Sequence, residues 1–139
     1  MSLLSSVPLF QDLSNSELQS LELFCQERFI KAWTVLFYEN DEATAMYIVK
    51  TWKMKAYRER NWVEQTLWHI SSWEFVWEMA FFDWNDVPKT RMATVRATED
   101  SNVVVIMNYS IIDLAKKHKE IFDKIVKTID LRKSINRWI

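Results

Sequence analysis

The spacing of apolar residues changes twice along the chain and divides it into three regions. Near the N-terminus Leu18, Leu21 and Phe24 recur at helical spacing, which predicts a short helix over residues 14–25. The preceding Ser14-Asn15-Ser16-Glu17 is a capping box, in which the serine hydroxyl and the glutamate carboxylate each satisfy a backbone amide of the first turn. The chain therefore opens with a helix that has a defined start.

The central region, residues 28–107, consists of short β-rich runs separated by polar turns. Its runs are rich in β-branched or aromatic side chains: "TVLFYEN", "AMYIVK", "KMKAYRER", "VEQTLWHI", "RMATVRAT" and "NVVVIM". Short strands at regular spacing predict an antiparallel β-roll or jelly roll, here of about eight strands.

The C-terminal region returns to a helical pattern. Ser110 to Asp113 gives a second N-cap pattern, and a long amphipathic helix is predicted over residues 110–133. Its apolar stripe comprises Ile111, Leu114, Ala115, His118, Ile121, Phe122, Ile125, Val126 and Ile129. We interpret this stripe first as core and second as a possible homodimer seam. The whole chain, residues 1–139, is thus predicted to be one mainly β domain with flanking helices.

Composition narrows the function classes. The chain has 139 residues, of which 49% are hydrophobic and 27% charged, with a net charge of -1, an ordinary soluble globular mixture. The charge gives no basic footprint for nucleic acid, and no apolar run is long enough for a membrane helix. Cys25 is the single cysteine, so no disulfide forms within the chain, and the start lacks the features of a signal peptide. We expect a cytoplasmic protein that binds neither nucleic acid nor membrane.

An enzyme is the class least favoured by the sequence. Two histidines and one cysteine, far apart along the chain, give no metal cluster and no evident Cys/His pair. The carboxylates form no distinctive acid/base pairing. We therefore expect no catalytic residues, no metal and no cofactor.

One feature of the composition is abnormal: the chain has eight tryptophans and no glycine, whereas on the order of ten glycines would be usual at this length. Five of the tryptophans, Trp33, Trp52, Trp62, Trp73 and Trp84, fall in the turn stretches between runs. Asn61-Trp62 stands where a two-residue type I′ hairpin favours Asn-Gly, because both central residues need positive φ. A bulky residue in that region costs roughly 1–2 kcal/mol.

We interpret the eight tryptophans as occupying the glycine positions of a glycine-containing sequence, written or engineered as tryptophan. The intact mass of the protein checks this interpretation. A mass well below 16.8 kDa would mean that the tryptophans are not all physically present.

With glycine read at those eight places, the chain resembles the cyclic nucleotide-binding domain family along nearly its full length. The stretch "VPLFQDLSNSELQSL" resembles the family's first helix, and "KAWTVLFYENDEATAMYIVKTWKMKAY" resembles its early strands. The most specific likeness is to the phosphate-binding cassette, where members carry F-G-E-(M/L)-A, a loop, and R-x-A-(T/S). Here the matching residues are Val76-Trp77-Glu78-Met79-Ala80 and Arg91-Met92-Ala93-Thr94.

The resemblance implies a β-roll that binds cAMP or cGMP and signals through its C-terminal helix. Arg91 matches the arginine that grips the cyclic phosphate, for which a guanidinium offers two parallel hydrogen bonds. Glu78 matches the carboxylate that accepts from the ribose 2′-hydroxyl, and backbone amides from Met79 and Ala80 onward add donors. Met92 and Ala93 complete the motif, and the absence of threonine at Met92 favours cAMP.

Two readings of these residues remain open. Glu78 and Arg91 taken alone could be a solvated pair worth about 0–1 kcal/mol. Trp77 replaces the family's glycine beside the sugar, so its indole would occupy space that the ribose needs. The alternative function is therefore a structural or interaction module of the same fold with a blocked pocket. Arg96 is interpreted as a structural or surface charge, His69 as a strand residue and His118 as a helix residue.

Overall fold

The structure is a computed structural model, which describes residues 4–51, 53–76 and 89–136. Its helices are the 3-10 helix η1 (Pro8–Phe10), α1 (Asn15–Glu22), α2 (Asn108–Lys117) and α3 (Lys119–Asn136). Its strands are β1 (Cys25–Ile30), β2 (Val35–Phe37), β3 (Glu42–Ala43), β4 (Ala45–Thr51), β5 (Met54–Arg60), β6 (Val63–Ile70), β7 (Phe75–Val76), β8 (Lys89–Thr90), β9 (Thr94–Ala97) and β10 (Ser101–Met107). The predicted mainly β class with flanking helices is confirmed.

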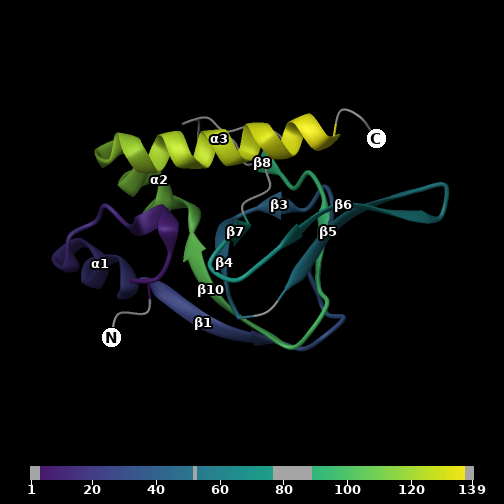
Figure 1. The fold of residues 1–139 in the computed structure, drawn as a ribbon, viewed down its shortest axis with the longest axis horizontal. Coiled ribbons are helices and arrows are strands. Elements are labelled where there is room, and N and C mark those ends of the chain that lie inside the picture. Colours follow the sequence, from purple (N-terminus) through teal and green to yellow (C-terminus); the bar gives the residue numbers. More distant parts are fainter. Residues whose placement is uncertain (1–3, 52, 77–88, 137–139) are drawn as a thin grey trace.

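All strand pairings in the described part of the chain are antiparallel. One four-stranded sheet has the order β1-β10-β4-β7, a second has the order β2-β9-β5-β6, and β3 pairs with β8. The first two sheets enclose a buried cluster, the roll core, to which Val49 and Val103 contribute from one sheet and Met54 and Val95 from the other. Figure 1 shows this roll, with the β5–β6 hairpin projecting from it.

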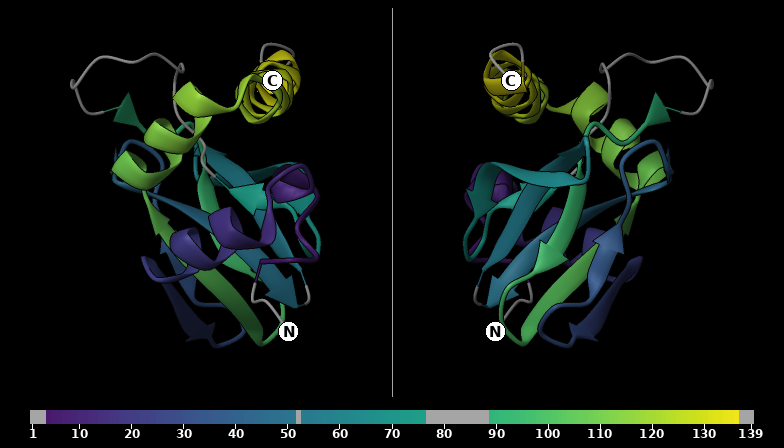
Figure 2. Two further views of the ribbon diagram at one scale, coloured as in Figure 1. Left: turned by 90° about the vertical axis from the view of Figure 1, so that its left-hand side faces the viewer. Right: turned by 90° about the vertical axis from the view of Figure 1, so that its right-hand side faces the viewer.

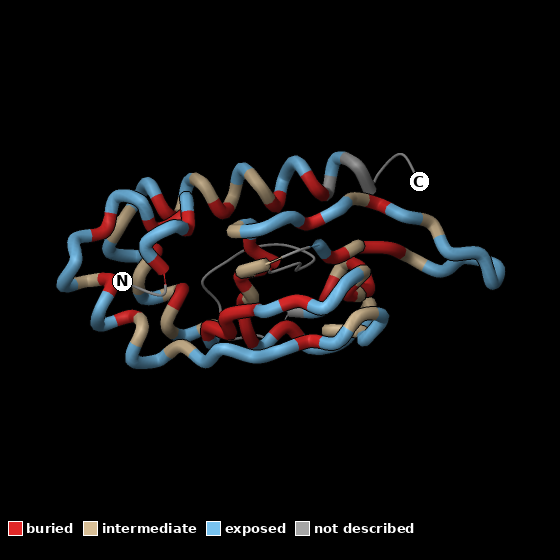
Figure 3. The backbone as a smooth tube through the Cα atoms, turned by 60° about the horizontal axis from the view of Figure 1, so that its bottom comes forward, coloured by how far each residue is buried: buried red, intermediate tan, exposed pale blue. Residues whose placement is uncertain are grey.

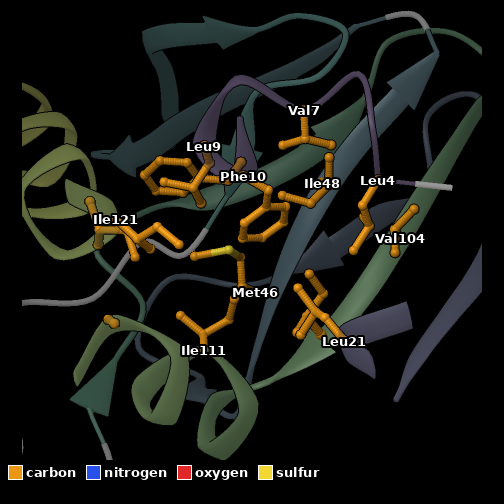
Figure 4. Packing of buried hydrophobic residues seen from close by; sticks show 14 of the residues in the cluster. Leu4, Val7, Leu9, Phe10, Leu21, Met46, Ile48, Val104, Ile111 and Ile121 are labelled. Carbon is orange, nitrogen blue, oxygen red and sulfur yellow. The ribbon is translucent and has the colours of Figure 1, made fainter. Parts of the chain in front are cut away.

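A second buried cluster, the helix-side core, joins the helices to the outer face of the β1-β10-β4-β7 sheet. Phe10 of η1, Met46 and Ile48 of β4, Ile111 of α2 and Ile121 of α3 all belong to it and are almost completely buried. Figure 4 shows their side chains meeting, and Figure 2 shows the helices gathered around this side of the roll. Burial of these side chains holds the helices in place, since each is worth about 1.5–3 kcal/mol of transfer free energy.

Helix α1 begins as the capping box predicts. The Glu17 amide donates to Ser14 Oγ at 3.2 Å, and the Ser14 amide donates to Glu17 Oε1 at 3.1 Å. The helix ends at Glu22, earlier than the predicted residue 25. Cys25 instead starts β1 and pairs with Ile106 of β10, a contact between distant segments that helical spacing alone does not reveal.

The C-terminal helical region differs from the prediction in its continuity. It starts at Asn108, two residues before the predicted start, and is divided into α2 and α3 at His118, whose φ of -127° and ψ of 100° are not helical. His118 was predicted to lie within a helix. It lies between the two helices, and its ring contacts Glu17 of α1, with Nε2 2.5 Å from Oε2. None of the described helices is long and apolar enough to cross a membrane.

Three of the five turn tryptophans lie in the described residues, and all three have the positive φ that favours glycine. The φ angles are 72° at Trp33, 66° at Trp62 and 69° at Trp73. Asn61, with φ of 55°, precedes Trp62 in the tight β5–β6 turn, so both central residues have the sign of a type I′ turn. Trp68 differs from them because it lies within β6. That tryptophan stands where glycine belongs stays a prediction.

The environment of Cys25 gives a prediction about its reactivity. Burial, followed by the charge of Glu22, raises the pKa of the Cys25 thiol to about 11. Because the thiolate is the nucleophile, we expect iodoacetamide to alkylate the native chain at pH 8 at least about tenfold more slowly than free cysteine. The rate should still rise between pH 9 and pH 10. Equal rates for the native and urea-unfolded chain would contradict the prediction.

Candidate functional site

Hydrogen bonds hold the backbone of Arg91 directly after the short strand β8, which pairs with β3. Its amide donates to Asp41 O at 2.8 Å, and its carbonyl accepts from the Asn40 amide at 3.0 Å. Directly before it, β8 pairs with β3 through Thr90 and Glu42. Asn40 itself has a φ of 74°, a conformation that asparagine tolerates better than most residues. The turn after β2 therefore sets where the Arg91 side chain enters the roll.

The Arg91 side chain lies inside the protein, with only 2% of the residue exposed. Its Nη2 donates to Ala45 O at 2.7 Å. The guanidinium carbon lies 4.0 Å from the ring centroid of Phe37 and 5.7 Å from that of Tyr47. A cation over an aromatic face is stabilised by the ring's negative face, but burial of a full charge still carries a large desolvation cost. The guanidinium thus lies between a backbone carbonyl and two aromatic rings.

The three residues after Arg91 lead from the site into the roll core. Met92 is half-buried, and Ala93 is fully buried in the roll core, where a larger side chain would not fit without displacing its neighbours. Thr94 Oγ1 accepts a hydrogen bond from the Glu39 amide at 2.9 Å. The other predicted site residues, Trp77, Glu78, Met79 and Ala80, lie outside the described residues. The structure thus describes only the Arg91–Thr94 half of the motif, and the assignment of all these residues to a ligand site stays a prediction.

Two other arginines, Arg60 and Arg96, form ion pairs on the sheet that contains β5, β6 and β9. Glu39 accepts from both Nη atoms of Arg60, at 3.0 and 2.9 Å, and this hydrogen bonding lowers the pKa of Glu39. Arg96 pairs with Glu64 at 3.1 Å, and Glu64 also pairs with Lys55, whose hydrogen bond lowers the Glu64 pKa. The interpretation of Arg96 as a structural charge is confirmed. His69 is a strand residue, as predicted.

One buried cation near the site was missed by the sequence analysis. Arg132 of α3 is 6% exposed, and its Nη1 donates to Phe75 O at 3.0 Å. It follows Ile129 by three positions, so the stripe of buried residues could have been extended to it. The pattern was read as apolar only, which is why a charged member was overlooked.

Among the described residues, no group of three His, Cys, Asp or Glu could hold a metal ion.

Solved structures of other proteins share this fold. The catabolite activator protein of Thermus thermophilus has a TM-score of 0.75 and 22% identity, over 94% of this chain and 60% of that one. The regulatory domain of Toxoplasma gondii PKA, solved with cAMP, has a TM-score of 0.69 and 23% identity, over 89% and 48%. The regulatory subunit of a cAMP-independent protein kinase A from Trypanosoma brucei has a TM-score of 0.73 and 17% identity, over 90% and 44%. The chain thus spans roughly half of each of these proteins, from 44% to 60%.

Comparison by sequence gives a narrower result. No curated protein matches the chain. The profile of the cyclic nucleotide-binding domain matches residues 27–118, which include nearly all of the roll, Arg91 and the whole of α2. Because this match covers well over half of the sequence and agrees with the fold, the chain belongs to the cyclic nucleotide-binding domain family.

Proposed function

We propose that this chain is a regulatory module that binds a cyclic nucleotide, with cAMP favoured over cGMP, and signals through its C-terminal helix. The observation that carries the proposal is the buried Arg91 guanidinium, held between Ala45 O and the faces of Phe37 and Tyr47. A cyclic phosphodiester bears one negative charge, which such a site would neutralise through charge-assisted hydrogen bonds. Glu78, Met79 and Ala80 would supply the ribose and further phosphate contacts.

A second candidate function is a structural or interaction module of the same fold that binds no nucleotide. Trp77 favours it, because an indole at the family's glycine position would occupy the space of the ribose. One relative with this fold belongs to a protein kinase A described as cAMP-independent. The same fold therefore does not by itself establish a response to cAMP.

Calorimetry with cAMP and with cGMP, on the chain and on its Trp77→Gly variant, distinguishes the two candidates. If the chain binds nucleotide, we expect Trp77→Gly to bind cAMP at least about tenfold more tightly, because glycine removes the steric conflict and allows close backbone approach. Binding by the variant alone would favour the second candidate for the chain as written. The absence of heat and of a thermal shift at millimolar cAMP and cGMP, for both proteins, would refute nucleotide binding.

Self-association through the C-terminal helix is also proposed. Leu131 of α3 is 65% exposed, whereas Ile121, Ile125 and Ile129 are committed to the helix-side core. Among the described side chains of α3, this one strongly exposed leucine offers far less than the roughly 800 Å² per partner of a stable interface. We therefore expect any dimer to be weak, which sedimentation at rising protein concentration would measure. The cytoplasmic location and the lack of nucleic-acid binding stay predictions.

A further inference from the structure

The buried face of α3 ends in a charged residue. Ile121, Ile125 and Ile129 are almost completely buried, and Arg132, on the same face one turn further, is buried as well. Figure 3 shows buried positions recurring along this helix. Arg132 therefore occupies a place where the preceding pattern uses isoleucine.

Arg132 attaches α3 to the strand that leads into the cassette. Its guanidinium donates to the backbone carbonyl of Phe75. The guanidinium carbon also lies 5.4 Å from the Phe75 ring centroid and 5.7 Å from that of Trp68. Phe75 and Val76 form β7, and Val76 is the first residue of the motif that resembles the cassette. The contact thus joins the C-terminal helix to the immediate approach to the proposed ligand site.

Strand β7 is in turn linked to Arg91. Val76 pairs with Tyr47 of β4, and the Tyr47 ring is one of the two that lie against the Arg91 guanidinium. Arg132 and Arg91 therefore contact the same β4–β7 strand pair, one through Phe75 and the other through Tyr47. A shift of β7 would change the contacts of both arginines, because a close-packed interior transmits strain.

An arginine is a poor choice if this contact serves stability alone. Burial of a guanidinium carries a desolvation cost that isoleucine at the same place would not carry. A pocket of about 290 Å³ borders this contact between η1, β7 and α3, and its lining includes Trp73, Phe75, Thr128 and Arg132. A hydrogen bond requires a defined distance and angle between donor and acceptor. The hydrogen bond to Phe75 O therefore makes docking of this end of α3 more sensitive to the position of β7 than an apolar contact would.

We propose that Arg132 is a positioning residue that couples docking of α3 to the position of β7 and, through it, to the Arg91 site. The identity of the ligand in this coupling rests on the proposed function, but the coupling between α3 and β7 does not. A nucleotide bound at the Arg91 site would, through the β4–β7 strand pair, strengthen the Arg132–Phe75 contact and hold α3 against the roll. An empty site would leave that contact easier to break.

The test compares three variants of the full chain by amide hydrogen exchange. Arg132→Met keeps the apolar bulk but cannot donate, and Arg132→Lys keeps the charge and one possible hydrogen bond. Lys124→Met is the matched control, because Lys124 lies on the same helix and borders the same pocket but donates to Pro8 O at 3.1 Å. Without nucleotide, Arg132→Met should speed exchange in β7 and around Arg91 by about tenfold. Arg132→Lys should partly restore protection, and Lys124→Met should leave it unchanged.

A second measurement adds cAMP to the same proteins. In the unmodified chain cAMP should slow exchange in α3, and in Arg132→Met this response should be lost. Unchanged exchange in Arg132→Met without nucleotide, or an equal effect of Lys124→Met, would overturn the coupling. If cAMP binds neither the chain nor Trp77→Gly, the proposed function fails, and the nucleotide-free comparison still decides the role of Arg132.

Discussion

Replacement of Arg91 by methionine is expected to weaken cyclic nucleotide binding by at least about 100-fold while the chain stays folded. Two charge-assisted hydrogen bonds to the phosphate, at about 1.5–3 kcal/mol each, exceed the roughly 2.7 kcal/mol to which this factor corresponds. Methionine fills much of the same volume beside Phe37 and Tyr47 and avoids the desolvation cost of a buried guanidinium, and circular dichroism checks that the variant is folded. Calorimetry on the chain, or in the Trp77→Gly background, measures the change in affinity.

Two companion variants make the test specific. Arg91→Lys keeps the charge but loses the planar pair of donors, so its affinity for cAMP should also fall strongly. Arg96→Met is the matched control, because Arg96 lies on the next strand and pairs with Glu64. Its loss should leave affinity within about threefold, since it removes a partly exposed ion pair and ring contacts with Trp33 and Tyr57, none of which involves Arg91. Equal losses for Arg91→Met and Arg96→Met would contradict the assigned role of Arg91.

The strands were the most predictable part of the fold, because their signals are local. Runs such as 45–50 and 63–70 alternate or concentrate β-branched side chains, and each became a strand. The tight turn at Asn61 and Trp62 followed from the backbone conformation that a two-residue hairpin requires. The short strands β3, β7 and β8 were not predicted, since two residues carry no period and are defined only by their partners.

The helix break at His118 could not be predicted for a different reason. His118 continues the helical period that runs from Ile111 to Ile121, so the stripe stays in phase across the break. The division depends on a contact with Glu17, which lies about one hundred residues earlier in the sequence. A histidine between a carboxylate on α1 and another at Glu120 is a tertiary arrangement that overrides local propensity.

The candidate site was predicted from a residue motif, which gives no information about its surroundings. Arg91 was identified through a motif, but its place beside Phe37, Ala45 and Tyr47 depends on strands that are distant in sequence. Arg132 carried a weaker signal, because a charged residue at the end of an apolar stripe is usually solvated. Its burial became evident only from tertiary contacts, among them the hydrogen bond to Phe75 O.

Trp62→Gly is expected to stabilise the chain by about 1 kcal/mol, whereas Trp68→Gly should destabilise it by about 2 kcal/mol. Trp62 is 98% exposed and has a φ of 66°, so glycine relieves roughly 1–2 kcal/mol of backbone strain. That gain exceeds the entropy that glycine adds to the unfolded chain, about 0.4–1 kcal/mol. Trp68 lies within β6 and packs against the roll core, so its removal loses buried area and leaves glycine within a strand.

Urea unfolding of the two variants and the unmodified chain measures both changes as shifts of the midpoint at constant slope. Trp33→Gly should fall between them, since its φ of 72° is equally strained but its ring also lies 5.6 Å from the Arg96 guanidinium. A destabilising Trp62→Gly would refute the strain argument, because that indole has almost no buried surface to lose. A stabilising Trp68→Gly would mean that β6 itself accommodates glycine better than tryptophan, as expected if all eight tryptophans occupy glycine positions.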